Sequence, residues 1–213
     1  MNLADLRENY TKGGIRLADM DPDPLVQLEL WLTAARDGGI REPNAMNLAT
    51  SNSTGHLSIR TVLLKALDQG SLRFFTNYRS RKARDLAANP NAAINFLWKD
   101  LERQVCLRGR VRKSSREVSE AYFRTRPYAS QIGAWVSERQ SEEVSVRAVL
   151  ELREQELLKR FPEETDVPCP DFWGGFDFQP SHIEFWQGRE SRIHDRIRYR
   201  QELGAWVIER LSP

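Results

Sequence analysis

Apolar side chains recur along this chain with two different periods, which predict helices in some segments and strands in others. Helical spacing begins after residues 21–24, whose carboxylates and prolines suit the first turn of a helix, and Gly38-Gly39 ends that helix. Ser80 is a candidate cap for a second helix. Helical spacing then predicts segments over 80–88, 115–124, 128–136 and 141–161.

Alternation of apolar and polar residues predicts strands in most of the remaining chain. The connections between these segments are short and the βαβ alternation of a parallel sheet is absent, so antiparallel pairing is favoured. We therefore expect a mainly β protein with peripheral helices (α+β), built as a small antiparallel β-barrel. The predicted strands are 45–50, 57–65, 72–76, 92–98, 104–112, 182–187, 192–200 and 205–211.

Composition bounds the size and the setting of this fold. The 213 residues suffice for one buried core, and 40% apolar with 29% charged residues is typical of a soluble globular protein. Residues 1–20 are polar and predict a flexible N-terminal arm, whereas 21–213 predict a single domain. The sequence shows no secretory signal, no membrane-spanning run and no paired cysteines, which favours a reduced, cytoplasmic compartment without membrane contact.

Several classes of function are disfavoured by the same counts. The net charge of +2 argues against nucleic-acid binding, although Arg108, Arg110 and Arg112 would form a cationic face on one strand. The three histidines are scattered without metal-ligand spacing, so no metal site is expected. Glycine-rich dinucleotide and P-loop motifs are absent.

Two basic clusters lie around the second and third predicted strands. Arg60 and Lys65 flank one strand and would lie on its opposite faces unless the strand bends. Ser80-Arg81-Lys82 would bring cations to a helix N-terminus, where free backbone N–H groups attract phosphate. Cations there are unfavourable for a helix alone, so an anionic partner would explain them.

Two further clusters lie towards the C-terminus. Tyr122 and Arg126 would share one helical face and, with Ser130, could bind a second anion. Residues 183–196 combine Trp186 with arginines and His194, which suits a planar, phosphorylated ligand. Taken together, the clusters predict two phosphorylated ligands, or one ligand with two phosphates.

Several of these segments resemble a known family. These segments resemble those of pyridoxamine/pyridoxine 5′-phosphate oxidases and follow one another in the same order. The resemblance extends from about Leu6 to the C-terminus. That resemblance implies an FMN-binding split β-barrel and a homodimer with its active site at the subunit interface. The segments are Arg60–Lys65, Ser80–Lys82, Leu101–Val105, Ser130–Trp135, Phe172–Gly175, Glu184–Gly188 and Arg192–Arg196.

The resemblance also implies a set of site residues. Arg192 and His194 would be the catalytic residues, and Arg7–Tyr10 would fold over the site as a lid. FMN would be bound by Arg60, Thr61, Val62, Leu63, Leu64, Lys65, Phe75, Thr76, Arg81, Lys82, Gln104, Gln140, Ser141, Trp186 and Arg196. The substrate would be bound by Arg7, Glu8, Asn9, Tyr10, Lys65, Tyr122, Arg126, Ser130, Arg192, Ile193 and His194.

Three departures from the family pattern concern this set. Gln140-Ser141 follows Ser137 with a spacing one residue longer than usual, Phe75 replaces a common tyrosine, and Glu42 replaces a common aspartate. The implied activity is oxidation of pyridoxamine or pyridoxine 5′-phosphate by O₂ to pyridoxal 5′-phosphate, with release of H₂O₂. The alternatives are another flavin-dependent split-barrel oxidoreductase, or a carrier of pyridoxal phosphate without catalytic activity.

Overall fold

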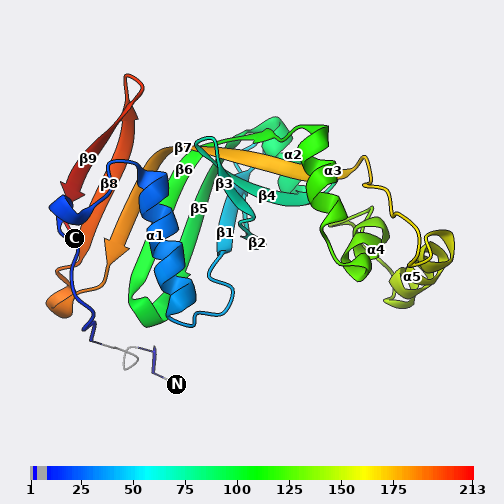
Figure 1. Ribbon diagram of the computed structural model, residues 1–213, viewed down its shortest axis with the longest axis horizontal. Coiled ribbons are helices and arrows are strands. Elements are labelled where there is room, and N and C mark those ends of the chain that lie inside the picture. Colours follow the sequence, from blue (N-terminus) through cyan, green and yellow to red (C-terminus); the bar gives the residue numbers. More distant parts are fainter. Residues whose placement is uncertain (1, 4–8) are drawn as a thin grey trace.

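The computed structural model describes residues 2–3 and 9–213, in which one antiparallel sheet joins all the strands (Figure 1). Arg7 and Glu8 of the expected substrate set lie outside the described residues. The strand order is β2-β1-β5-β6-β7-β4-β3, and β8 pairs with β7 and with β9. The strands are β1 Ala45–Ser51, β2 Leu57–Leu63, β3 Ala66–Asp68, β4 Ser71–Asn77, β5 Asn91–Trp98, β6 Arg103–Lys113, β7 Trp173–Gln187, β8 Asp195–Glu202 and β9 Ala205–Leu211.

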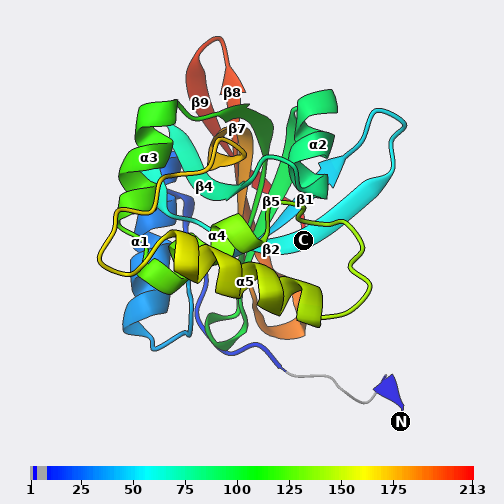
Figure 2. The same ribbon diagram turned by 90° about the vertical axis from the view of Figure 1, so that its right-hand side faces the viewer.

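Helices pack on the sheet in several places, and α2 lies against β1 with Ala83 and Leu86 in the main core (Figures 1 and 2). α1 packs on the middle of the sheet, where the Trp31 ring meets Trp98 and Phe185 edge to face. α3, α4 and α5 lie at the far end of β7 and enclose a separate apolar cluster around Phe123. The helices are α1 Pro24–Asp37, α2 Arg81–Ala88, α3 Arg116–Arg124, α4 Tyr128–Val136 and α5 Ala148–Arg160, with 3₁₀ turns at Leu17–Asp19, Lys99–Leu101 and Glu190–Arg192.

The long strand β7 connects the two ends of the molecule. Its first half pairs with β4, and its second half pairs with β8. Because a strand advances about 3.3 Å per residue, Trp173 and Trp186 are roughly 40 Å apart along it. Figure 1 shows α3–α5 at one end of this strand and the β8–β9 hairpin at the other.

The predicted start of this strand at residue 182 is wrong, because β7 begins at Trp173. Gly174 and Gly175 resemble strand breakers, but a Cβ at Gly174 would lie 2.2 Å from the Tyr78 hydroxyl, and one at Gly175 2.6 Å from Ser114 Oγ. These glycines therefore allow close packing inside a strand. Pro180 faces Gly109 of β6 at a register shift, where a proline is tolerated.

Other boundaries also differ from the prediction. Helix α5 begins at Ala148 and not at 141, and β8 begins at Asp195, after Ser191 and Arg192 adopt left-handed backbone angles (φ 56° and 61°). Strand β2 ends at Leu63 and the short β3 follows it, so Lys65 lies between two strands. The mainly β, antiparallel fold class is confirmed. Among the described residues, no helix is long and apolar enough to cross a membrane.

Candidate functional site

A cavity of about 540 Å³ lies between β2, β4, α2 and the α3–α4 corner. Four of its side chains are cations, and none of the described residues that line it is Asp or Glu. The lining residues are Arg60, Thr61, Val62, Leu63, Lys65, Phe75, Thr76, Lys82, Tyr122, Thr125, Arg126, Pro127, Ser130, Gln140 and Trp173. Residues of three clusters predicted from the sequence, around Arg60, Lys82 and Arg126, thus line one cavity.

Arg60 and Lys65 reach the same cavity because the chain leaves β2 after Leu63. The expectation of opposite faces therefore applies only to an unbroken strand. Leu64, expected near the cofactor, is buried and donates its backbone N–H to the Asn44 carbonyl. It does not line the cavity.

The Arg60 guanidinium is fixed at the cavity wall. It donates to the Leu48 carbonyl at 3.0 Å and to Thr50 Oγ1 at 2.8 Å. Burial lowers the pKa of Arg60, while the Asp85 carboxylate 3.9 Å away opposes that shift. Asp85 was missed by sequence analysis, since the apolar spacing of α2 does not show that its inward face carries a carboxylate.

Lys82 is the cation whose pKa is most affected. Burial, and then the charge of Arg60, lower the pKa of Lys82 to about 8. Its Nζ donates to Thr76 Oγ1 at 3.2 Å and to Gln140 Oε1 at 3.4 Å, both neutral acceptors. A dianionic group in this cavity would favour the charged lysine.

The N-terminus of α2 faces the same region. Ser80 occupies the N-cap position of α2, as predicted, but its hydroxyl makes no capping hydrogen bond and donates to the Asn77 carbonyl at 2.7 Å. The Arg81 backbone N–H instead donates to Ser141 Oγ at 3.2 Å. Gln140-Ser141, whose register was open in the sequence, thus lies beside the first turn of α2.

At the opposite wall, Arg126 is a half-buried cation that forms no ion pair with the described residues. Its Nη1 is buried and has no hydrogen-bond partner among the described residues. Burial lowers the pKa of Arg126. The guanidinium lies 4.7 Å from the centre of the Trp173 ring and 5.5 Å from that of Phe123. Burying an unpaired charged nitrogen is costly, so an anion at this wall would stabilise Arg126.

A second group of expected residues lies at the other end of β7. Gln104, Trp186 and Arg196 form one row across β6, β7 and β8, since Trp186 is paired with both of the others. Arg196 is also held by two hydrogen bonds to the Glu184 carboxylate, at 2.8 and 3.1 Å. This row is separated from the cavity by most of the length of β7, so a single chain does not bring the whole expected FMN set together.

His194 and Ile193 line another cavity, of about 650 Å³, beside that row. The Arg189 backbone N–H donates to His194 Nδ1 at 3.1 Å, which leaves Nε2 to carry the proton of a neutral ring. Tyr10 packs edge to face on His194 and on Trp186, with ring centres 5.5 and 5.7 Å apart. Arg192 is exposed. Asn9, which precedes Tyr10, is exposed too.

Comparison with family models gives two matches in succession along the chain. Residues 32–160 match the model described as pyridoxamine 5′-phosphate oxidase. Residues 173–213 match the model described as the pyridoxine 5′-phosphate oxidase C-terminal dimerisation region. The second match covers β7, β8 and β9, and therefore the row that contains Trp186 and Arg196.

Curated relatives agree with these matches. A pyridoxine/pyridoxamine 5′-phosphate oxidase of Burkholderia mallei is 50% identical over 214 residues, which cover 99% of each chain. The enzyme of the same name from Deinococcus deserti is 50% identical and covers 100% of this chain and 99% of its own.

Solved structures show the same fold. PhzG from Burkholderia lata, in complex with tetrahydrophenazine-1-carboxylic acid, has a TM-score of 0.89 at 26% identity and covers 97% of this chain and 100% of its own. A pyridoxamine 5′-phosphate oxidase-related, FMN binding protein from Nostoc punctiforme has a TM-score of 0.73 at 17% identity, covering 91% and 100%. The prediction of a split barrel and of an oxidase-family enzyme is confirmed: this chain belongs to the pyridoxamine 5′-phosphate oxidase family.

Proposed function

We propose that this protein uses FMN to oxidise pyridoxamine 5′-phosphate and pyridoxine 5′-phosphate with O₂. The product is pyridoxal 5′-phosphate, with release of H₂O₂ and, from the amine, ammonia. The observation that carries this proposal is the cavity, whose described lining has four cations and no carboxylate and includes Arg126, with its Nη1 unpartnered by any described residue. A phosphate monoester carries about −1.5 to −2 charges at neutral pH, so these cations match two phosphates and not one.

The residues present fit FMN on one side of the cavity. Arg60, Lys82 and the first turn of α2 would hold its phosphate, since cations and the positive end of a helix dipole meet there. FMN bound there would supply the acceptor for a hydride equivalent from C4′ of the substrate, with O₂ as the final oxidant. Phe75 and Thr76 lie on β4 between these cations and Tyr122, where they would border the flavin ring.

The other side of the cavity fits the phosphate of the substrate. Lys65, Tyr122, Arg126 and Ser130 would form charge-assisted or neutral hydrogen bonds to it. Those that involve a charged donor contribute about 1.5–3 kcal/mol each. Their task is to hold the C4′ carbon in position for reaction, because catalysis of this kind depends on orientation.

The second half of the site requires a second copy of the chain. Gln104, Trp186 and Arg196 lie too far from the cavity of their own chain to contact a ligand there. A homodimer would bring them, together with Arg192 and His194, to the cavity of the other chain. Support comes from the match of residues 173–213 to a dimerisation region. Arg192 would then cover the free face of the pyridine ring, and His194 would position the substrate or move a proton.

The test combines a spectrum with an assay. Purified protein, saturated with FMN, should retain the yellow flavin spectrum after gel filtration. It should form aldehyde and peroxide when mixed with pyridoxamine 5′-phosphate in air. A protein that stays colourless contradicts the proposal. A protein that binds the phosphate ester but releases no peroxide would instead be a carrier of pyridoxal phosphate.

A second candidate is a flavin-dependent oxidation of a different substrate, favoured by the likeness to PhzG. The ligand in that structure, tetrahydrophenazine-1-carboxylic acid, is a tricyclic carboxylic acid without a phosphate group. The two activities can be separated by comparing pyridoxine 5′-phosphate with pyridoxine. Our proposal requires a strong preference for the phosphate ester, because Arg126 and Lys65 face its phosphate. Equal turnover of both compounds would favour the second candidate.

A further inference from the structure

Three aromatic rings are stacked along the wall of the cavity. The Phe75 and Tyr122 ring centres are 3.9 Å apart with an interplanar angle of 17°. The Trp173 ring lies 5.5 Å from Phe75 at 11° and 6.2 Å from Tyr122 at 7°. The three rings are therefore almost parallel, and Trp173 presents one ring face to Arg126.

Trp173 is itself held from several sides. Its backbone N–H donates to the Pro170 carbonyl at 3.0 Å, and it pairs with Asn77 at the start of β7. Phe123 meets its ring edge to face at 5.1 Å. Only 6% of the residue is exposed. The indole is thus a fixed surface and not a mobile side chain.

The Arg126 side chain depends on that surface for its direction. The backbone of Arg126 is fixed by hydrogen bonds to Phe123 O and from Gln131 Nε2. Its guanidinium, however, forms no ion pair among the described residues, and its Nη1 has no partner. The ring faces of Trp173 and Phe123 are the contacts that orient the cation, and tryptophan is the strongest aromatic partner for a cation.

We propose that Trp173 is a positioning residue, which holds the Arg126 guanidinium in the direction that the substrate phosphate requires. This inference rests on the proposed function. A cation that is oriented before binding loses less side-chain entropy when the phosphate binds. Loss of the indole should therefore weaken binding of phosphate esters about fivefold to thirtyfold. Binding of the unphosphorylated compound should not change.

The experiment uses the FMN-loaded protein and a dead-end ligand, 4-deoxypyridoxine 5′-phosphate, which lacks the oxidisable C4′ hydroxyl. Its Kd is measured from the change in the flavin spectrum, with 4-deoxypyridoxine as the phosphate-free counterpart. Trp173→Leu should raise the Kd of the phosphate ester only. Trp173→Phe keeps an aromatic ring, so its Kd for the phosphate ester should lie between those of Trp173→Leu and the wild type.

Trp135→Leu is the matched control. Trp135 belongs to the same apolar cluster and also lies near an arginine, with Arg160 5.7 Å from its ring, but it does not line the cavity. The same loss of an indole there should leave the Kd unchanged. An equal rise in both leucine variants would mean that general loosening of the cluster, and not the cavity contact, causes the effect.

A double-mutant cycle tests whether Trp173 acts through Arg126. In an Arg126→Ala background, Trp173→Leu should add little further loss. The proposal is overturned if Trp173→Leu and Trp173→Phe both bind the ester as wild type does, or if the loss is the same with and without Arg126. Failure of the proposed function has a different signature, because wild-type protein would then not discriminate between the ester and 4-deoxypyridoxine.

Discussion

At the residue scale, the titration of Lys82 has a measurable consequence for the cofactor. Burial and the charge of Arg60 lower the pKa of Lys82 to about 8, and a bound dianionic phosphate would raise it. Below pH 8 the lysine is already charged, whereas above pH 8 FMN binding must be accompanied by proton uptake. The affinity for FMN should therefore fall as the pH rises from 8 to 9, by up to about tenfold per pH unit.

The phosphate of FMN remains essentially a dianion over this range, because its second pKa is near 6. Lys82→Met provides the control, since it removes the titrating group. Calorimetric titration should show weaker binding of this variant at pH 7 and no further loss between pH 8 and 9. If wild-type affinity is constant over that interval, Lys82 does not contact the phosphate.

Sequence analysis identified many of the cavity residues but not what fixes them. Arg60, Lys82 and Arg126 could be identified from the sequence because each belongs to a cluster of basic and polar residues that suits an anion. Asp85 and Trp173 are parts of a helix and of a strand whose apolar spacing is ordinary. Asp85 and Trp173 contact Arg60 and Arg126, which are distant from them in the sequence. The periodicity of apolar residues does not show such tertiary contacts.

At the element scale, two carboxylates hold the described part of the N-terminal arm on the sheet. Glu102 accepts hydrogen bonds from the backbone N–H groups of Thr11 and Lys12, each at 3.0 Å. Asp195 accepts from the Ile15 N–H at 3.0 Å and pairs with Arg210. Burial opposes ionisation of Asp195, but these bonds hold its pKa below the ordinary value.

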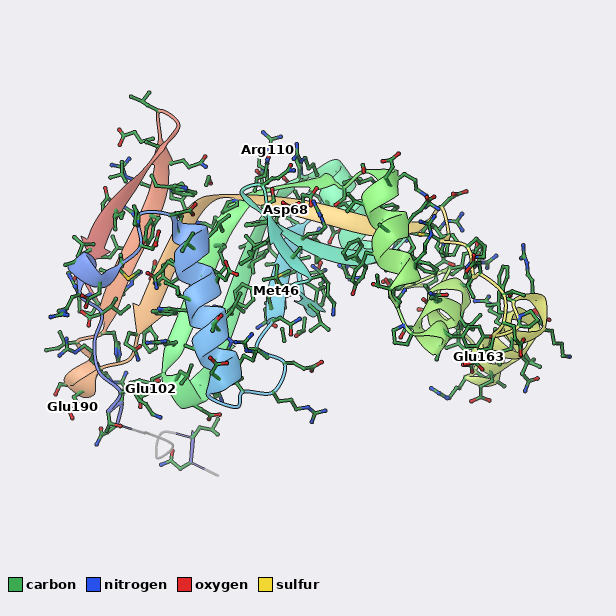
Figure 3. All side chains as sticks on the ribbon, viewed as in Figure 1. Met46, Asp68, Glu102, Arg110, Glu163 and Glu190 are labelled. Carbon is green, nitrogen blue, oxygen red and sulfur yellow. The ribbon has the colours of Figure 1, made fainter. Side chains whose placement is uncertain are left out.

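Removal of one carboxylate should release only its own part of the arm. In Glu102→Ala, the amides of Thr11 and Lys12 should exchange hydrogen faster, because both lose their acceptor, while Ile15 keeps Asp195. Exchange measured by NMR would show this. Glu163→Ala is the control, since Glu163 is exposed at the opposite end of the molecule (Figure 3). Unchanged exchange at Thr11 would mean that Glu102 does not hold the arm.

The elements were predicted best where their boundaries have a local cause. α1 starts as expected, because the Asp23 carboxylate accepts a hydrogen bond from the Leu25 N–H. β7 was predicted too short, since Gly174 and Gly175 serve close packing against Tyr78 and Ser114, which are distant in sequence. α5 was predicted too long, as the charged pattern of residues 141–147 is compatible with a helix but lacks tertiary packing to form one.

At the scale of the whole molecule, β7 separates the two parts of the expected site. Trp173, at the start of β7, lines the cavity. Trp186 lies near the end of β7, beside Gln104 and Arg196. Sequence could predict both sets of residues, but not that one chain keeps them apart. The resemblance implied a site shared by two chains, and the separation of the two sets along β7 is what such a site would require.

Complementation between two inactive variants tests this arrangement most directly. Arg126→Ala impairs the cavity and Arg192→Ala impairs the other half, so each variant alone should have little turnover of pyridoxamine 5′-phosphate. Co-expression with two different tags allows the mixed dimer to be purified. In that dimer one site combines both substitutions and the other has neither.

The mixed dimer should recover about half of the wild-type turnover per dimer, because a two-fold dimer contains two such sites. Mixed dimers of Arg126→Ala with Lys65→Ala provide the control, since both substitutions affect the same half and neither site is intact. A mixed dimer of Arg126→Ala and Arg192→Ala as inactive as its parents would contradict the claim that two chains build each site.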